Sequence, residues 1–226
     1  MEMKTKAVIF DFDGTLTVGR ANNVWKMLYL ELGYNIGEGS NYRNSFLSFK
    51  NKEYDYASWV NVNKKDFIYA GLNKEIFNKV LEEIKLIKGL EKTLKSLTEK
   101  GIKLFVLSGN IVYSIKHVLG DLAKYFTEIS ANEAIFDEDG TLVDLIATKY
   151  DFEGKADFIV KVREELGVKP DEITFVGNGS NDIWAYKSGA RTICINPKDA
   201  DEDKTEKWTK VLPIVKDLSE ILEYID

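Results

Sequence analysis

The sequence predicts an α/β fold, a doubly wound parallel sheet with a small helical cap domain inserted after the first strand. Short apolar runs at residues 7–10, 102–107 and 173–176 are rich in β-branched and aromatic residues, as buried strands are. Amphipathic segments of helical length separate the later runs, and this alternation is typical of a parallel sheet. The strand–helix loops at one edge of such a sheet form its ligand site.

The first predicted strand, residues 7–10, reads Ala-Val-Ile-Phe and is too short for a helix. Asp11 and Asp13 follow it directly, and Gly14 and Thr15 come next. Carboxylates avoid a sheet interior unless something pairs with them. At a strand end, two of them indicate a cation site with a reactive carboxylate, and the alternative is a plain surface turn.

Residues 18–87 differ from the rest of the chain because they are rich in Asn, Lys and aromatic residues and contain few strand-like runs. Their apolar residues recur at spacings that suit amphipathic helices, and glycines mark turns between them. We therefore expect a helical cap domain over residues 18–87 and an α/β core domain formed by residues 1–17 and 88–226.

From residue 90 onward, predicted helices and strands alternate. Asp139-Gly140 lies between two apolar runs and predicts a hairpin turn. The expected elements are a helix over 90–100, a strand over 102–107, a helix to about 119, strands over 127–130, 134–136 and 142–146, a helix over 154–166, strands over 173–176 and 192–195 with a helix to about 188 between them, a strand over 211–215 and a helix over 218–225.

Composition excludes several classes of function. The net charge of −6 and the pI near 5.1 argue against a nucleic-acid surface, which needs a basic face. A single cysteine fits a reducing compartment, no apolar run approaches the ~20 residues of a membrane span, and residues 1–6 do not read as a signal peptide. We expect a soluble cytoplasmic protein with no nucleic-acid or membrane partner, and the oligomeric state does not follow from the sequence.

Two further polar segments lie beside predicted helix starts. Ser108, Gly109 and Asn110 follow a strand, where a hydroxyl and backbone N–H groups can hold an anion, although Ser108 alone also fits a helix N-cap. Lys155 lies at a helix start, which is unfavourable for the helix dipole and indicates another use. Lys149 is the alternative lysine.

These motifs, in this order, resemble those of the haloacid dehalogenase-like hydrolases, whose first motif is Asp-x-Asp-x-Thr after a hydrophobic strand. The resemblance implies a Rossmann-like core of the haloacid dehalogenase type. It also implies that Asp11 attacks phosphorus and Asp13 acts as acid and base. Ser108, with Gly109 and Asn110, would then bind the phosphate, and Lys155 would neutralise charge at the site.

The segment at residues 177–182, Gly-Asn-Gly-Ser-Asn-Asp, is similar to the fourth motif of phosphoserine phosphatase-like members, Gly-Asp-Gly-x-Asn-Asp. The resemblance implies Mg²⁺ held by Asp11, Asp13, Asn178 and Asp182. Asn178 stands where the family has a metal-binding Asp, and an amide oxygen carries no formal charge. We expect weaker Mg²⁺ affinity or a shifted role for Asp182.

The cap of this family selects the substrate. Phosphoserine phosphatases have an acid shortly after the first motif for the substrate amino group and a cap arginine for its carboxylate. This chain has no acid between Asp13 and Glu31, carries Arg20 in that stretch, and has Lys65 near the place of the cap arginine. Arg20 and Lys65 as substrate-binding residues would suit an acidic or polyanionic ester better than a zwitterion.

The resemblance therefore implies a Mg²⁺-dependent phosphomonoesterase that acts on a small phosphorylated metabolite through an aspartyl-phosphate at Asp11. Three alternatives stay open. Two are of the same class, a phosphoserine phosphatase specifically and a phosphotransferase. The third is a weakened member that binds a phosphorylated ligand without efficient hydrolysis because of Asn178. A dehalogenase does not fit, since Asp13 and Thr15 follow the phosphatase branch.

Overall fold

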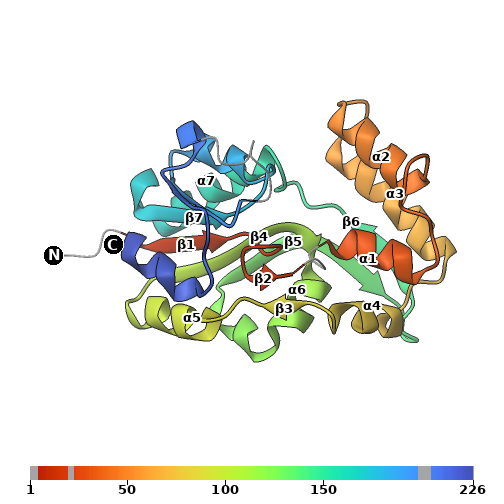
Figure 1. Ribbon diagram of the computed structural model, residues 1–226, viewed down its shortest axis with the longest axis horizontal. Helices are drawn as coiled ribbons and strands as arrows, with labels where there is room; N and C mark the ends of the chain where they lie inside the picture. The colour runs from red at the N-terminus through yellow and green to blue at the C-terminus, as the bar shows by residue number, and fades with distance from the viewer. Residues whose placement is uncertain (1–4, 20–22, 198–204, 226) are drawn as a thin grey trace.

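The protein is described by a computed structural model that covers residues 5–19, 23–197 and 205–225, and its centre is a seven-stranded sheet (Figure 1). The strand order is β6-β5-β4-β1-β7-β8-β9, and each neighbouring pair is parallel except β5 and β6. This confirms the doubly wound α/β fold. The strands are β1 (Ala7–Phe10), β4 (Lys103–Ile111), β5 (Glu128–Phe136), β6 (Leu142–Ile146), β7 (Ile173–Gly177), β8 (Arg191–Ile195) and β9 (Lys210–Leu212).

Helices cover both faces of the sheet because its central strand is apolar on both sides. Val8 and Phe10 pack into one hydrophobic core, and Ala7 and Ile9 pack into another, as the twofold alternation of a strand requires. Figure 1 shows α5 and α6 on one side of the sheet and α7 on the other. The first layer consists of α5 (Leu90–Glu99), α6 (Val112–Leu119) and η5 (Leu218–Tyr224), and the second of α7 (Gly154–Leu166) and η3 (Ile183–Ser188).

The chain between β1 and α5 forms, in its described part, four α-helices and a two-stranded ribbon. Each helix begins at an Asn, Ser or Asp whose side chain accepts a backbone N–H, the usual N-cap arrangement. Their large side chains, Tyr29, Trp59 and Phe67 among them, form a separate core. The elements are β2 (Thr17–Val18), α1 (Val24–Glu31), α2 (Asn41–Lys50), α3 (Tyr56–Tyr69), α4 (Lys74–Leu81) and β3 (Lys85–Leu86), with β2 antiparallel to β3.

This helical segment is bonded to the β5–β6 hairpin. The N–H of Leu142 donates to the carbonyl of Leu72 at 2.8 Å, and the N–H of Lys74 donates to the carbonyl of Gly140 at 2.9 Å. Buried side chains of β6 also join the core of the helices. The hairpin therefore holds α3 and α4 beside the sheet.

The observed boundaries differ from the predicted ones at several elements. β4 runs on to Ile111, and the strands predicted at 127–130 and 134–136 are one strand, β5. The helices predicted after residue 182 and near the C-terminus are short 3-10 helices, and the β2–β3 ribbon was not predicted because two-residue strands carry no periodic signal. The other 3-10 helices are η1 (Gly120–Tyr125), η2 (Pro170–Glu172) and η4 (Thr205–Lys207).

No helix among the described residues is long and apolar enough to cross a membrane. The cytoplasmic location stays a prediction.

Two leucines test the packing of the helices. Leu94 on α5 is fully buried, whereas Leu30 on α1 is 53% exposed. We expect Leu94→Ala to lower the free energy of unfolding by about 3 kcal/mol, since it removes apolar contacts and leaves a cavity. Leu30→Ala is expected to cost less than about 1 kcal/mol. Urea unfolding of both variants measures the two losses, and equal losses would contradict the described packing.

Candidate active site

A tight turn places two carboxylates at the end of β1. The N–H of Thr17 donates to the carbonyl of Phe12 at 3.2 Å, and the N–H of Gly14 donates to Oγ1 of Thr17 at 3.0 Å. Gly14 has φ of +81°, a conformation that costs a glycine little. The turn keeps Asp11 buried and Asp13 half-buried at the carboxyl edge of the sheet.

A bulge in β4 brings the second predicted motif to the same edge. Leu107 pairs with Ser130 of β5, whereas Ile111 pairs with Asn132, so β4 holds two more residues than β5 in this interval. β4 lies beside β1 and runs parallel to it. Ser108, buried at the start of the bulge, therefore lies near the end of β1.

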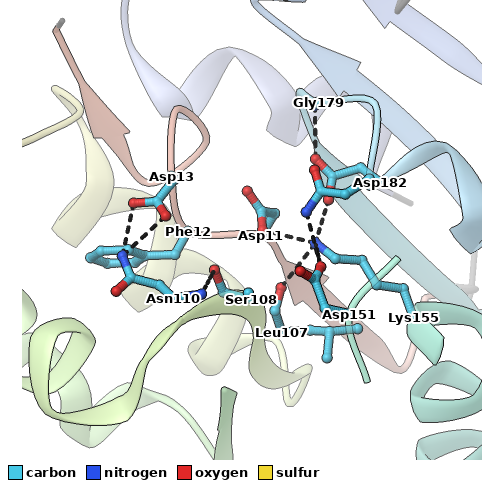
Figure 2. Close-up of polar contacts among 12 residues, drawn as sticks. Asp11, Phe12, Asp13, Leu107, Ser108, Asn110, Asp151, Lys155, Gly179 and Asp182 are labelled. Carbon is cyan, nitrogen blue, oxygen red and sulfur yellow. Dashed lines mark hydrogen bonds and ion pairs between the residues drawn. The ribbon is translucent and has the colours of Figure 1, made fainter. Parts of the chain in front are cut away.

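The bulge connects directly to the first motif. Asn110 donates from Nδ2 to both carboxylate oxygens of Asp13, each at 3.0 Å, and its backbone N–H donates to Oγ of Ser108 at 3.2 Å (Figure 2). The N-cap residue of α6 is Ile111. Ser108 is therefore not a helix N-cap, and that alternative is wrong.

Lys155 lies at the centre of the site and is fully buried (Figure 2). Its ammonium donates to Oδ1 of Asp11 at 2.9 Å, to Oδ1 of Asp182 and to the carbonyl of Leu107 at 3.4 Å, and it lies 3.9 Å from Oδ1 of Asp151. Burial lowers the pKa of Lys155, but the surrounding carboxylates outweigh burial and hold this pKa above its ordinary value. Lys155 therefore stays charged and joins β1, β4 and the loop after β7.

Asp182 is bound entirely to protein groups. Besides Lys155, it accepts the backbone N–H of Asn178 and of Gly179, each at 2.8 Å to Oδ2 (Figure 2). The carboxylate thus shapes the loop that follows β7. Its predicted role as a metal ligand stays a prediction, and the contacts support a positioning role.

The oxygen atoms of Asp11, Asp13 and Asn178 are the candidates for holding a metal ion. No three His, Cys, Asp or Glu side chains converge as a metal site within residues 5–19, 23–197 and 205–225, so a site here would include the amide of Asn178. Oδ1 of Asn178 is buried and has no hydrogen-bond partner among the described residues. Such an orphaned oxygen fits a hard cation.

Asp151 was not predicted, although it lies four residues before Lys155. Its Oδ1 accepts from Nδ2 of Asn181 at 3.0 Å, and burial is the main reason that its pKa is raised. A Cβ on Gly109 would lie 2.1 Å from Oδ2 of Asp151, so only glycine allows this approach. The one local signal was the acid–lysine spacing of a helical turn.

Asn132 supports the bulge and was also missed. Its Nδ2 lies 2.8 Å from the carbonyls of Gly109 and Asn110 and from the hydroxyl of Tyr56. The indole of Trp25 donates to the same Gly109 carbonyl at 3.0 Å. A lone Asn inside a strand gives no sequence signal for such a role.

The structure does not bring every predicted residue to the site. Lys65 is exposed on α3 and does not line the cavity at the site, where Lys50 of α2 is the lining lysine. Arg20 lies outside the described residues. Lys149 is exposed, so Lys155 is the lysine that the fold places at the carboxylates.

A cavity of about 230 Å³ lies between the strand ends and the helices of the inserted segment. Its lining combines the polar groups described above with several aromatic rings. The lining residues are Asp11, Asp13, Asn23, Trp25, Phe46, Phe49, Lys50, Tyr56, Trp59, Ser108, Gly109, Asp151, Phe152, Gly179, Ser180 and Asn181.

A family model for haloacid dehalogenase-like hydrolases matches residues 5–189. The chain therefore belongs to the haloacid dehalogenase-like hydrolase family. The matched segment includes Asp11, Lys155 and the loop after β7.

Several relatives and solved structures of similar fold are named phosphoserine phosphatase. A probable phosphoserine phosphatase of Schizosaccharomyces pombe is 28% identical over 197 residues, which is 86% of this chain and 62% of that protein, so the chain spans less than two thirds of that relative. The phosphoserine phosphatase of Methanocaldococcus jannaschii is 24% identical over 226 residues, 100% of both chains. A phospho-aspartyl intermediate analogue of phosphoserine phosphatase matches with a TM-score of 0.75 at 23% identity, over 98% of this chain and 99% of that one, which shows the shared fold.

The raised pKa of Asp151 predicts a pH effect on stability. Since the folded carboxyl binds a proton more readily than the unfolded one, its contribution to the free energy of unfolding falls as the pH rises from the ordinary value of 3.8 through the raised value. We expect Asp151→Asn to gain stability relative to the unchanged protein as the pH rises above about 4. Urea unfolding of both proteins over a pH series measures this, and a difference that stays constant would contradict it.

Proposed function

We propose that the protein is a Mg²⁺-dependent phosphatase that hydrolyses a small phosphomonoester through an aspartyl-phosphate at Asp11. One observation carries this proposal: the buried ammonium of Lys155 lies 2.9 Å from Asp11, beside Ser108 and the cavity that Asp11 lines. A phosphomonoester brings negative charge to a carboxylate nucleophile, and a fixed cation offsets the repulsion between them.

In the first step, the carboxylate of Asp11 attacks phosphorus. Lys155 binds Oδ1 of Asp11 and holds the carboxylate in place for this attack. The new O–P bond forms as the bond to the substrate alcohol breaks, and Asp13 gives its proton to the leaving oxygen. Ser108 and Gly109, which line the cavity at the bulge, hold the transferring oxygens.

In the second step, Asp13 takes a proton from a water molecule whose oxygen attacks phosphorus. The bond to Asp11 breaks, and inorganic phosphate leaves with the site restored. Asn110 keeps Asp13 in place through its two 3.0 Å contacts. Asp13 would lie beside the leaving oxygen in the first step and beside the water oxygen in the second. One carboxyl group can therefore serve both proton transfers.

Asp11, Asp13 and Asn178 are the proposed Mg²⁺ ligands. The orphaned oxygen of Asn178 supports this assignment. The site also holds more carboxylates than cations, since Lys155 is in ion-pair contact with three aspartates. When bound, Mg²⁺ would offset charge on the phosphate and on the carboxylate of Asp11.

We further propose that residues 18–87 act as a cap domain over the core formed by residues 1–17 and 88–226. The helices of this segment contribute Trp25, Phe49 and Tyr56 to the cavity. Residues that select the organic part of the substrate would then come from the cap, and those that handle phosphate from the core.

The names of the relatives favour phosphoserine as the substrate, and this is the second candidate. The cavity supports it less well than it supports phosphate chemistry in general. Among the residues that the structure describes, its lining contains no arginine, and Lys65 lies outside it. The names of the relatives therefore do not decide which phosphomonoester this cavity binds.

Replacing the nucleophile tests the mechanism. We expect Asp11→Asn to lower kcat by at least about 10³-fold, because an amide cannot form the aspartyl-phosphate. Phosphate release from a panel of phosphomonoesters, with Mg²⁺ and with a chelator, measures this. Asp139→Asn, at an exposed acid of the hairpin turn, is the control and should keep full activity. Appreciable turnover by Asp11→Asn would defeat the mechanism.

Replacing the amide tests the metal assignment. We expect Asn178→Asp to bind Mg²⁺ at least roughly tenfold more tightly, because it adds a formal charge at an oxygen that has no hydrogen-bond partner within the described part of the chain. Calorimetric titration with Mg²⁺ gives both affinities without depending on turnover. An unchanged affinity would remove Asn178 from the metal site.

A further inference from the structure

The wall of the cavity away from the strand ends is aromatic. Trp25 and Trp59 have ring centroids 5.0 Å apart, and Tyr56 lies 5.8 Å from Trp59. Phe49 of α2 meets Phe152, which precedes α7, at 4.8 Å in an edge-to-face arrangement. These rings come from three helices of the inserted segment and from the core, so the fold gathers them at one place.

The acids of the cavity are poorly placed to bind a substrate ammonium group. Asp11 and Asp13 belong to the end that handles phosphate. The third acid, Asp151, is 8% exposed, accepts from Asn181 at 3.0 Å and lies 3.9 Å from the ammonium of Lys155. Its charge is therefore already offset within the protein.

The cationic groups of the cavity are equally few. Among the described lining residues, Lys50 is the one basic side chain. It is exposed, and its ammonium lies 5.7 Å from the ring centroid of Phe152. A zwitterionic amino acid needs an acid and a base placed together, and the described lining does not offer that pair.

We propose, resting on the phosphatase function proposed above, that the substrate is a phosphomonoester whose organic part is an uncharged aromatic ring. Aromatic rings prefer edge-to-face and offset contacts with other rings, and burying them is favourable by itself. The ring would contact Phe49, Tyr56 and Phe152 while the phosphate lies at Asp11 and Ser108.

A second cavity gives such a ring room for substituents. It measures about 570 Å³ and shares Phe49, Tyr56 and Phe152 with the first. Its further lining includes Trp184 and the charged residues Lys52, Asp55 and Glu153, so it would take polar substituents. The shared rings place the proposed contact where the two cavities meet. Substituents on the substrate ring would extend into the second cavity.

Binding of non-hydrolysable phosphonates tests this proposal apart from turnover. Isothermal titration calorimetry with Mg²⁺ present would compare benzylphosphonate, cyclohexylmethylphosphonate and 2-amino-3-phosphonopropionate. We expect benzylphosphonate to bind at least about tenfold more tightly than the zwitterion, and more tightly than the saturated ring, because flat rings stack better.

Two matched substitutions locate the contact. Phe49→Leu keeps an apolar side chain but removes the ring. It should lower the affinity for benzylphosphonate about fivefold and leave the affinity for the zwitterion, 2-amino-3-phosphonopropionate, unchanged. Tyr69→Leu removes a ring that is 90% exposed on α3 and does not line either cavity. It should change neither affinity.

The outcomes separate the substrate class from the proposed function. If O-phosphoserine is hydrolysed in an Asp11-dependent way and benzylphosphonate binds no better than the zwitterion, the substrate class is wrong and the phosphatase function stands. If Phe49→Leu weakens the binding of all three phosphonates equally, the proposed ring contact is also wrong. If no phosphonate binds and no phosphomonoester is hydrolysed, the proposed function fails and this proposal fails with it.

Discussion

The site depends on one buried ion cluster, the ammonium of Lys155 among the carboxylates of Asp11, Asp151 and Asp182. A lysine taken out of water is stable only when its charge is paired, and here three acids from separate parts of the chain pair with it. The cluster therefore binds β1, the start of α7 and the loop after β7 to one another. It also fixes the carboxylate of Asp11, which is proposed to attack phosphorus. The contact between Lys155 and Asp11 therefore serves both the stability of the fold and the proposed reaction.

Backbone carbonyls are the second constraint. The bulge in β4 leaves the carbonyls of Gly109 and Asn110 outside the regular ladder, and Nδ2 of Asn132 lies 2.8 Å from both. Trp25 donates to the Gly109 carbonyl as well, so a residue of the inserted helices contacts the loop of the proposed phosphate site directly. Together with the bonds between the helices and the β5–β6 hairpin, this contact sets the shape of the cavity.

The loop after β7 carries the neutral amide of Asn178 where the resembled motif has an acid. Asp182 still shapes the loop through two backbone N–H groups, so the loop does not need a charge at residue 178 to keep its conformation. The buried amide oxygen of Asn178 has no hydrogen-bond partner among the described residues, which supports its proposed role as a cation ligand. The expected consequence is a difference in metal affinity, with the positions of Asp11 and Lys155 unaffected.

The sequence by itself determined the sheet, the helix over residues 154–166, the location of Asp11 at a strand end and the location of Lys155 at a helix start. Apolar runs and their polar ends are local patterns, and neighbouring parallel strands must end at one edge. The sequence did not predict the roles of Asp151 and Asn132 in the site, because their partners are set by a bulge and by contacts between distant segments. The same holds for Lys50, which lines the cavity where Lys65 was expected. Only the packing of the inserted helices against the hairpin decided which of their side chains face the site.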